Sequence, residues 1–226
     1  MKKALPTLIL GLFLCFPALS QTKTVDSKKP YWTSGGEWIF STGTLDNFNN
    51  VVRFSPVVNL QVLANFDKSE KFGWFTGGTF RNVGFIYDES QTVRKKVRNY
   101  NLGIPIGLKF GNMNGSFVFG GYELEMALNY RERRFENEVR TDRFSVWFSD
   151  RVNFFQHALF VGVALPKGTS IKAKYYLTSF YNQDFQASDG SGNLVKPYQG
   201  IDANIFYISL NFSLFRNWEL YDYDED

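Results

Sequence analysis

Acidic and basic side chains recur at every second position in two distant segments of the chain. Successive side chains of an extended strand point to opposite faces, so residues two apart share a face. Carboxylates and ammonium groups on different strands either neutralise one another inside a closed sheet or line a charge-selective pore. The candidate residues for such an internal ion-pair network are Arg53, Lys109, Glu123, Glu125, Lys172 and Lys174.

Two basic clusters offer a second kind of chemistry. One lies at 94–98 and the other at 131–134. Guanidinium and ammonium groups bind phosphate oxygens through charge-assisted hydrogen bonds. The competing interpretation is a pair of solvated polar loops that need no ligand. The residues concerned are Arg94, Lys95, Lys96, Arg98, Arg131, Arg133 and Arg134.

A third candidate is His157, the only histidine of the chain, with Ser149 and Asp150 close to it in sequence. Serine, histidine and a carboxylate are the components of a hydrolase triad, although geometry and not sequence spacing defines a triad. We therefore favour an interfacial position for His157 and assign no catalytic residue. Neither a metal nor a cofactor is expected.

The first twenty residues have the features of a secretory signal peptide. Lys2 and Lys3 supply positive charge, an apolar run follows over 8–17, and small residues stand at the positions that a signal peptidase reads. Cleavage is expected after Ser20, which removes Cys15, the only cysteine. The expected product is an exported chain without a disulfide bond.

Composition limits how this chain can meet a membrane or another partner. Aromatic residues make up 18% of the sequence, but the mean hydropathy is only −0.25. After residue 20, no run is apolar over the roughly 18 residues that a spanning helix needs, so a membrane crossing must use strands. The 25 basic and 22 acidic residues nearly balance, which leaves no basic footprint for nucleic acid.

Alternation of apolar and polar residues is the main structural signal from Glu37 onward. Between Asn99 and Phe110, every second residue is large and apolar. The segment 118–131 repeats the pattern and places Tyr130 on the same apolar face as Val118. The register of 72–87 stays open. Eight strands are predicted, at 37–44, 52–66, 72–87, 99–110, 118–131, 154–165, 170–180 and 201–215.

The connections between these strands alternate in length. Such alternation is typical of a bacterial outer-membrane barrel, whose short turns are periplasmic and whose long loops are extracellular. An even number of strands returns both termini to the periplasm. The predicted fold is an all-β, eight-stranded antiparallel up-and-down transmembrane β-barrel. Short turns are expected at 67–71, 111–115 and 166–168, and long polar loops at 88–98, 132–152 and 181–200.

A soluble lipocalin-like barrel is the alternative, and it would turn the apolar face inward. Glycine on the polar faces, as at Gly103 and Gly107, suits a crowded interior better than a solvated exterior. This feature favours lipid outside. The expected organisation is a signal peptide at 1–20, an N-terminal periplasmic segment at 21–36, the barrel at 37–215 and an acidic tail at 216–226.

Three segments resemble the Bacteroidetes-type outer-membrane β-barrel family, described as porin-like or PorT-like. The segment from Asn99 to Phe110 resembles that family's Tyr-Leu-x-Ile-Pro-Leu-x-Leu-Lys strand, 115–122 is similar to its next strand, and 208–215 is similar to its aromatic-ended last strand. The resemblance spans about 37–215 and implies an outer-membrane location. The sequence departs from the pattern after Phe215, where an acidic tail follows.

The predicted function is non-enzymatic. Eight strands leave an interior just wide enough for side chains, so the lumen is expected to be plugged by ion pairs. The long loops are then expected to bind ligands, or the barrel serves as an accessory subunit of an envelope complex. The alternatives are a narrow ion or small-solute pore and a lipid-modifying enzyme. The expected partners of this monomer are outer-membrane lipid, including lipopolysaccharide at the basic clusters, and an envelope protein, with no nucleic acid.

Overall fold

The computed structural model describes residues 29–45 and 48–219, with side chains described as far as Ser213. The predicted signal peptide and residues 220–226 of the predicted tail lie outside these ranges. Among the described residues, no helix is long and apolar enough to cross a bilayer.

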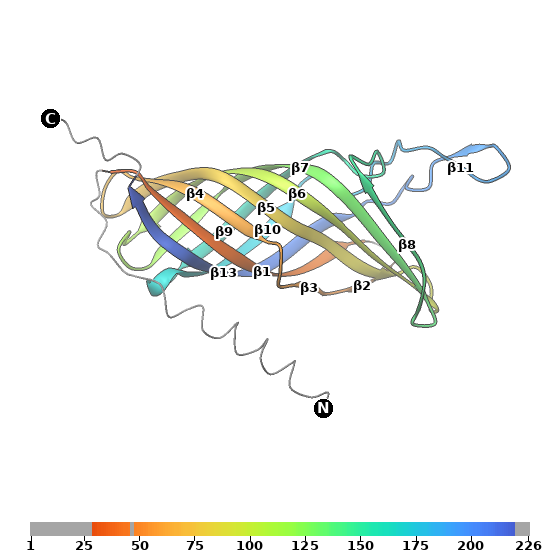
Figure 1. Cartoon of the computed structure of the whole chain (residues 1–226), viewed down its shortest axis with the longest axis horizontal. Coiled ribbons are helices and arrows are strands. Elements are labelled where there is room, and N and C mark those ends of the chain that lie inside the picture. The colour runs from red at the N-terminus through yellow and green to blue at the C-terminus, as the bar shows by residue number, and fades with distance from the viewer. Residues whose placement is uncertain (1–28, 46–47, 220–226) are drawn as a thin grey trace, which may run out of the picture.

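Within the described ranges, eight strands follow one another in sequence order and close into a ring (Figure 1). Each strand is antiparallel to its neighbours, and β1 completes the ring by pairing with β13. The predicted eight-stranded up-and-down barrel is confirmed. The strands of the ring are β1 (Tyr31–Thr44), β4 (Leu60–Asp67), β5 (Phe72–Asp88), β6 (Val93–Gly111), β7 (Phe117–Glu136), β9 (Phe155–Ala164), β10 (Thr169–Tyr176) and β13 (Asn204–Glu219).

The wall of the barrel is interrupted before β4. In place of one strand at 52–66, the short strands β2 (Asn49–Val51) and β3 (Arg53–Ser55) pair with β5 and β1 respectively. Pro56 has no N–H to donate, and the chain leaves the ladder there. In the interruption, Asn59 Nδ2 donates to the Ser55 carbonyl at 2.8 Å, and Asn59 Oδ1 accepts the Asn82 N–H at 2.8 Å. The side-chain amide of Asn59 therefore bridges the wall where strand pairing stops.

Two of the predicted long loops are strands instead. β5 and β6 stay paired as far as Asp88 and Arg94, so 88–98 is mostly a hairpin. β7 continues to Glu136 and pairs with β8 (Val139–Trp147), so 132–152 is mostly a second hairpin. Charged side chains occur on both faces of these extensions and conceal the alternation that identifies strands.

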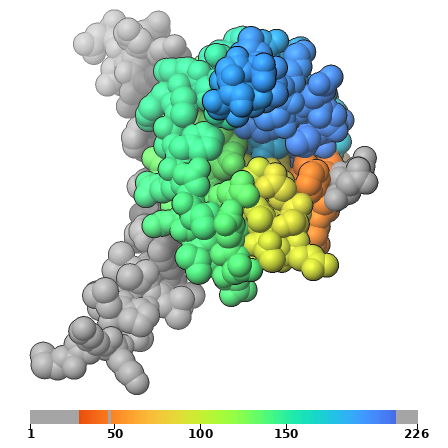
Figure 2. Space-filling model, turned by 90° about the vertical axis from the view of Figure 1, so that its right-hand side faces the viewer, coloured from red at the N-terminus to blue at the C-terminus, as the bar shows by residue number. Residues whose placement is uncertain are grey.

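The barrel has two different ends. Figure 1 shows the β7–β8 hairpin and the short strand β11 (Ala187–Ser188) projecting from one end, which we call the long-loop end. β11 pairs with β12 (Leu194–Val195) inside the predicted loop 181–200. In Figure 2, β7–β8 (green) and this loop (blue) cover most of the face at that end. The tight turns before β5, β7 and β10 lie at the other end, the short-turn end.

The strands extend past both predicted boundaries of the barrel. β1 begins at Tyr31 and pairs from there with both β4 and β13, so 31–36 is wall and not a separate segment. The residues of 33–36 are threonine, serine and glycine, which carry no apolar alternation. β13 continues to Glu219, so the barrel takes in the first residues of the predicted tail.

The structure settles the facing of β5, which the sequence left open, and corrects the predicted facing of part of β7. In β5 the odd-numbered residues face inward, as Val83 and Phe85 show by their full burial. Tyr130 also faces inward and is 1% exposed, so its predicted position on the outer face is wrong. Asn101 pairs with Ala127 but Tyr100 pairs with Asn129, and the extra residue in β7 reverses its facing beyond that point.

Ring closure predicts a disulfide between the first and last strands. In a Cys15→Ser background, Phe40→Cys with Ile208→Cys is expected to oxidise, because the two positions pair directly and both are exposed. Non-reducing electrophoresis measures the altered migration of the cross-linked chain. Phe40→Cys with Ile104→Cys is the control, since β1 and β6 are not neighbours. Cross-linking in the control, or none in the test pair, would contradict the closed ring.

Candidate functional site

The strands of the barrel have one apolar face and one polar face, and the apolar face points outward. On β6, Ile104 is 61% exposed, whereas Asn101 on the opposite face is 1% exposed. A lipocalin-like barrel requires the reverse arrangement, so that alternative is contradicted. We call the exposed apolar surface the outer belt; it includes Phe40, Leu60, Ile104, Leu159, Ile171 and Ile208, from β1, β4, β6, β9, β10 and β13.

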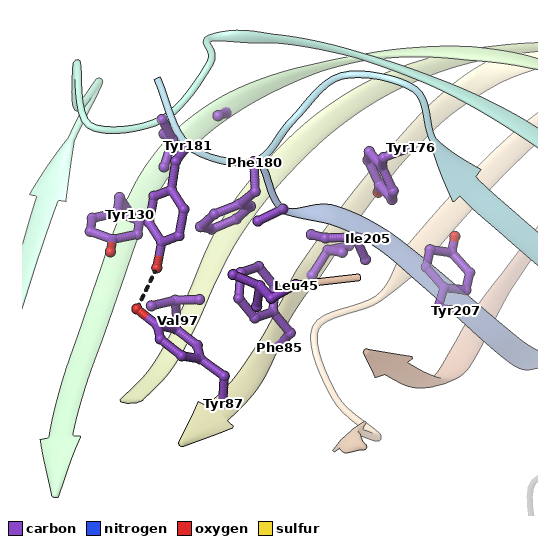
Figure 3. Packing of buried hydrophobic residues seen from close by; sticks show 14 of the residues in the cluster. Leu45, Phe85, Tyr87, Val97, Tyr130, Tyr176, Phe180, Tyr181, Ile205 and Tyr207 are labelled. Atoms are coloured by element: carbon purple, nitrogen blue, oxygen red, sulfur yellow. Dashed lines mark hydrogen bonds between the residues drawn. The ribbon is translucent and has the colours of Figure 1, made fainter. Parts of the chain in front are cut away.

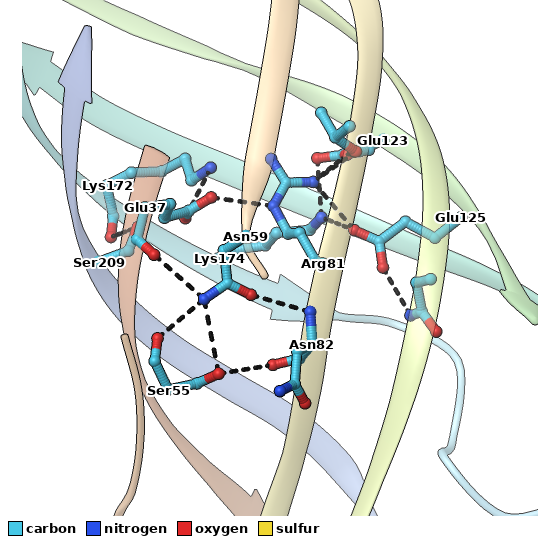
Figure 4. A network of polar contacts seen from close by, with 12 residues as sticks. Glu37, Ser55, Asn59, Arg81, Asn82, Glu123, Glu125, Lys172, Lys174 and Ser209 are labelled. Carbon is cyan, nitrogen blue, oxygen red and sulfur yellow. Dashed lines mark hydrogen bonds and ion pairs between the residues drawn. The ribbon is translucent and has the colours of Figure 1, made fainter. Parts of the chain in front are cut away.

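Inside the barrel, Arg81 of β5 is the centre of a network of ion pairs (Figure 4). Its Nε lies 3.0 Å from Glu37 Oε2, its Nη1 contacts Glu123, and the same nitrogen lies 3.2 Å from Glu125 Oε1. These carboxylates come from β1 and β7, so the arginine links two walls of the barrel.

Two lysines of β10 complete the arrangement. Lys174 Nζ lies 2.7 Å from Glu123 Oε2 and also contacts Glu125. Lys172 Nζ lies 3.0 Å from Glu37 Oε1. In the described part of the chain, three carboxylates thus meet three cations, and all six residues are 5% exposed or less. Burial of charge is tolerated only when the charge is paired. We call Glu37, Arg81, Glu123, Glu125, Lys172 and Lys174 the lumen network.

Neutral groups satisfy the remaining carboxylate oxygen of the network, Glu125 Oε2. Tyr176 Oη and Asn101 Nδ2 each donate to Glu125 Oε2 at 2.7 Å. Gly103 of β6 lies against the same carboxylates, and a Cβ at this position would be 2.6 Å from Glu123 Oε1. A larger residue at this position would therefore displace the carboxylate of Glu123, and glycine leaves the network undisturbed.

The structure brings together four of the six charged residues predicted to meet in the lumen. These are Glu123, Glu125, Lys172 and Lys174. Lys109 lies apart near the short-turn end, where its Nζ contacts Asp67. The same nitrogen donates to Asn65 Oδ1 at 3.1 Å.

Arg53 occupies the interruption in the wall. Its guanidinium donates to the Asn82 carbonyl at 3.1 Å and to Asn82 Oδ1 at 2.6 Å. No ion pair joins Arg53 to a carboxylate among the described side chains. Its expected membership in the ion-pair network is therefore wrong, because the broken strand places it beside β5 and away from β7.

Three charged residues of the interior were not predicted: Glu37, Asp67 and Arg81. Arg81 lies in the segment whose register the sequence left open, so its facing was undetermined. Glu37 stood at a predicted strand start and Asp67 at a predicted turn. The signal that could have predicted an inward-facing Arg81 is that it shares one face of the strand with Val83 and Phe85, both of which are buried.

Aromatic side chains fill the lumen between the network and the long-loop end (Figure 3). The Phe85 and Phe180 rings meet edge to face at 5.2 Å, and Tyr181 stacks on Tyr198 at 4.4 Å. Burial raises the pKa of Tyr181 well above its usual value, so its phenol stays neutral. We call Phe85, Tyr87, Tyr130, Phe180, Tyr181 and Tyr198 the aromatic plug; each is 8% exposed or less.

A cavity of about 120 Å³ occupies the lumen on the other side of the network. Phe75, Phe119 and Phe160 form its apolar wall, and it reaches from the short-turn residue Gly115 to Arg81. From the long-loop end inward, the described lumen is thus filled first by aromatic rings, then by paired charges, and finally contains open space.

His157 lies on the outer surface and not in the lumen. Its Nδ1 lies 2.5 Å from the Tyr122 hydroxyl on the neighbouring strand β7. The structure does not bring Ser149 and Asp150 into hydrogen-bond contact with the ring. Among the described residues, no group of three or more His, Cys, Asp or Glu side chains is arranged to hold a metal.

The seven residues of the two basic clusters divide into two sets. Three are paired with carboxylates: Arg94 with Asp88 at 2.6 Å, Lys95 with Glu89 at 2.6 Å and Arg134 with Glu136 at 3.1 Å. The other four have no ion pair with a carboxylate in the described part of the chain; they are Lys96, Arg98, Arg131 and Arg133.

Fold and lumen together define an eight-stranded barrel with a filled interior. No protein-family model and no curated protein matches this chain. Solved structures with a similar arrangement include Ail, the attachment invasion locus protein of Yersinia pestis, with 9% identity and a TM-score of 0.38 over 82% of this chain and 99% of that one. CarO2 of Acinetobacter baumannii has 10% identity and a TM-score of 0.34 over 80% and 99% of the two chains.

The outer membrane protein OprG from Pseudomonas aeruginosa is a further similar structure, with 11% identity and a TM-score of 0.31 over 82% of this chain and 94% of that one. With TM-scores this low, the fold assignment rests on the chain's own strand pairing. The resemblance to a Bacteroidetes-type family stays a prediction.

Removal of Arg81 tests the lumen network. Arg81→Met is expected to destabilise the barrel by about 3–5 kcal/mol, because it leaves buried carboxylates without their counter-charge. The temperature at which the folded, heat-sensitive band disappears from an unboiled gel sample measures this loss. Arg94→Met is the matched control, because its ion pair with Asp88 is half exposed and such pairs contribute little. Equal effects of the two substitutions would contradict the central position of Arg81.

Proposed function

We propose that this chain is an integral β-barrel of a bacterial outer membrane, is not an enzyme, and presents its long-loop end to the outside of the cell for binding. The observation that supports this most is the inversion of polarity across the wall. Apolar side chains form the outer belt, while paired charges lie inside.

The outer belt is the argument for lipid. Soluble monomers rarely expose contiguous apolar patches larger than a few hundred Å². Here exposed apolar side chains come from strands all around the ring, including Leu60, Val161 and Ile208. Hydrocarbon is a suitable surrounding for such a surface, and ring closure satisfies the backbone N–H and C=O groups that lipid cannot.

The filled lumen favours a binding or structural protein over a pore. A solute entering at the long-loop end would meet the aromatic plug and then the lumen network. Paired, hydrogen-bonded charges resist displacement, because separating them would leave buried charge unpaired. The enzyme alternative has its only histidine on the outer surface beside Tyr122, without the serine and aspartate suggested by sequence.

The long-loop end provides the surface for binding. Its hairpins are held by the same ladders that form the barrel, so β5–β6 and β7–β8 project as continuous strands and not as loose loops. Binding residues are commonly carried by such projections on a rigid scaffold. The partners we propose are outer-membrane lipid and an envelope or surface protein.

Spin labels test the membrane position. With Cys15→Ser as background, a nitroxide at Ile104→Cys in proteoliposomes is expected to collide frequently with oxygen and rarely with a water-soluble nickel chelate. A nitroxide at Val139→Cys, a position that is also well exposed, at 67%, but lies beyond the belt in β8, should show the reverse. Power-saturation measurements report both collision rates. Preference of the Ile104 label for the nickel chelate would refute membrane insertion.

Planar bilayers test the filled lumen. The purified barrel is expected to insert without step-like conductance, because the plug and the network occupy its cross-section. A known porin in the same bilayer serves as the positive control. Steady conductance steps that disappear in the Glu123→Ala, Glu125→Ala variant would instead establish the pore alternative.

A further inference from the structure

One group of cations faces outward beyond the outer belt. On β6, Val97 and Asn99 are fully buried in the interior. Lys96 precedes Val97 and Arg98 lies between the two buried residues, so both cations point outward. On β7, the inward facing of Tyr130 turns Arg131 and Arg133 outward as well. Arg143 of β8 pairs with Arg133 and shares its face. We call Lys96, Arg98, Arg131, Arg133 and Arg143 the cationic patch.

Strand register places these cations directly opposite one another. Arg98 pairs with Arg131, Lys96 pairs with Arg133, and Arg133 also pairs with Arg143. Like charges directly opposite in a sheet are destabilising. The patch therefore costs the isolated barrel stability, in contrast to the balanced lumen network.

The contacts of the patch within the chain are to neutral groups. Arg131 Nε donates to Asn129 Oδ1 at 3.2 Å and to Ser145 Oγ at 3.1 Å. The guanidinium groups of Arg98 and Arg131 lie 5.5 Å and 5.3 Å from the Tyr100 ring centroid. None of the five cations has an ion pair with a carboxylate in the described part of the chain, whereas Arg94, Lys95 and Arg134 each have one.

The position of the cationic patch relative to the outer belt indicates its depth with respect to the proposed membrane. Tyr100 separates Arg98 from Leu102, the first outer-belt residue of β6. Trp147 and Phe148, which are 65% and 63% exposed, lie level with Tyr100 along the barrel axis. Trp147 pairs with Asn129, and Asn129 pairs with Tyr100. Tyrosine and tryptophan gather at the boundary between hydrocarbon and headgroups. The patch follows directly beyond this boundary.

We infer that the cationic patch binds the phosphate groups of an outer-leaflet glycolipid whose acyl chains lie along the outer belt of β6 and β7. This rests on the proposed outer-membrane location. Residues two apart on a strand are about 7 Å apart and neighbouring strands about 5 Å, so the five cations can reach one phosphate or two adjacent ones. Arginine forks bind phosphate oxygens in pairs. The anion supplies the counter-charge that the protein lacks on this face.

Comparison of the wild type with two variants, each with and without lipid, tests the inference. The probe is bisphosphorylated lipid A added to the full chain in detergent, with dephosphorylated lipid A and inorganic phosphate as separate arms. The patch variant is Arg98→Gln, Arg131→Gln, Arg133→Gln. The matched control is Arg94→Gln, Lys95→Gln, Arg134→Gln, which removes equal charge from the same hairpins. Retention of fluorescent lipid A and the conversion temperature of the folded gel band are the two readouts.

The patch variant is expected to bind bisphosphorylated lipid A at least about tenfold more weakly than the wild type, and the control within about twofold. Without lipid, the patch variant should convert at a temperature about 2 °C higher than the wild type, because like-charge repulsion is relieved. With lipid, that order should reverse. A structural role alone would not produce such a reversal.

Equal binding by the patch variant and the wild type would overturn the inference, as would equal binding of dephosphorylated lipid A. Competition by millimolar inorganic phosphate to the same extent as by lipid A would assign the patch to free phosphate and also overturn it. A folded band in the wild type and in both variants supports the barrel independently of the lipid. Its absence in all three would refute the proposed function together with the inference.

Discussion

The six charged side chains of the lumen network must remain paired with one another, because an unpaired charge in a closed interior is strongly destabilising. Glu37, Arg81, Lys172 and their partners come from β1, β5, β7 and β10, which lie on different sides of the ring. The pairs therefore form only when the ring closes in one register. A slip by one residue would turn these charges toward the outside and the apolar residues inward. Charge pairing and ring closure thus depend on each other.

The contents of the lumen follow from its narrow bore. Large aromatic rings, long cations and carboxylates fill it where side chains face one another, and Gly103 and Gly107 provide room where β6 passes Glu123 and Phe75. The arrangement is asymmetric, since the aromatic plug lies toward the long-loop end and the cavity toward the short-turn end. A barrel filled in this way has a stable wall from which hairpins can project, but it lacks an open path through the part of the lumen that the structure describes.

Charged side chains have opposite consequences on the inner and the outer face of the barrel wall. Inside, acidic and basic groups balance within the chain, and neutral donors such as Tyr176 and Asn101 complete the shell around Glu125. Outside, beyond Tyr100, cation faces cation across three strands. The interior is thus complete in itself, whereas the outer cationic patch is electrostatically complete only with an external anion. Its place beside the outer belt connects the proposed membrane location to the proposed lipid partner.

Local alternation in the sequence was sufficient to predict eight strands, their antiparallel order, the short turns and the inward facing of Glu123, Glu125, Lys172 and Lys174, because a strand's two faces are set by its own period of two. What each inward residue meets depends on register across strands that are far apart in sequence. Only the tertiary structure therefore showed that Arg81 links Glu37 to Glu123, that Arg53 fills an interruption in the wall, and that one extra residue in β7 turns Tyr130 inward. The polar extensions of β5–β8 were missed for the same reason: cross-strand pairing, and not alternation, holds them as strands.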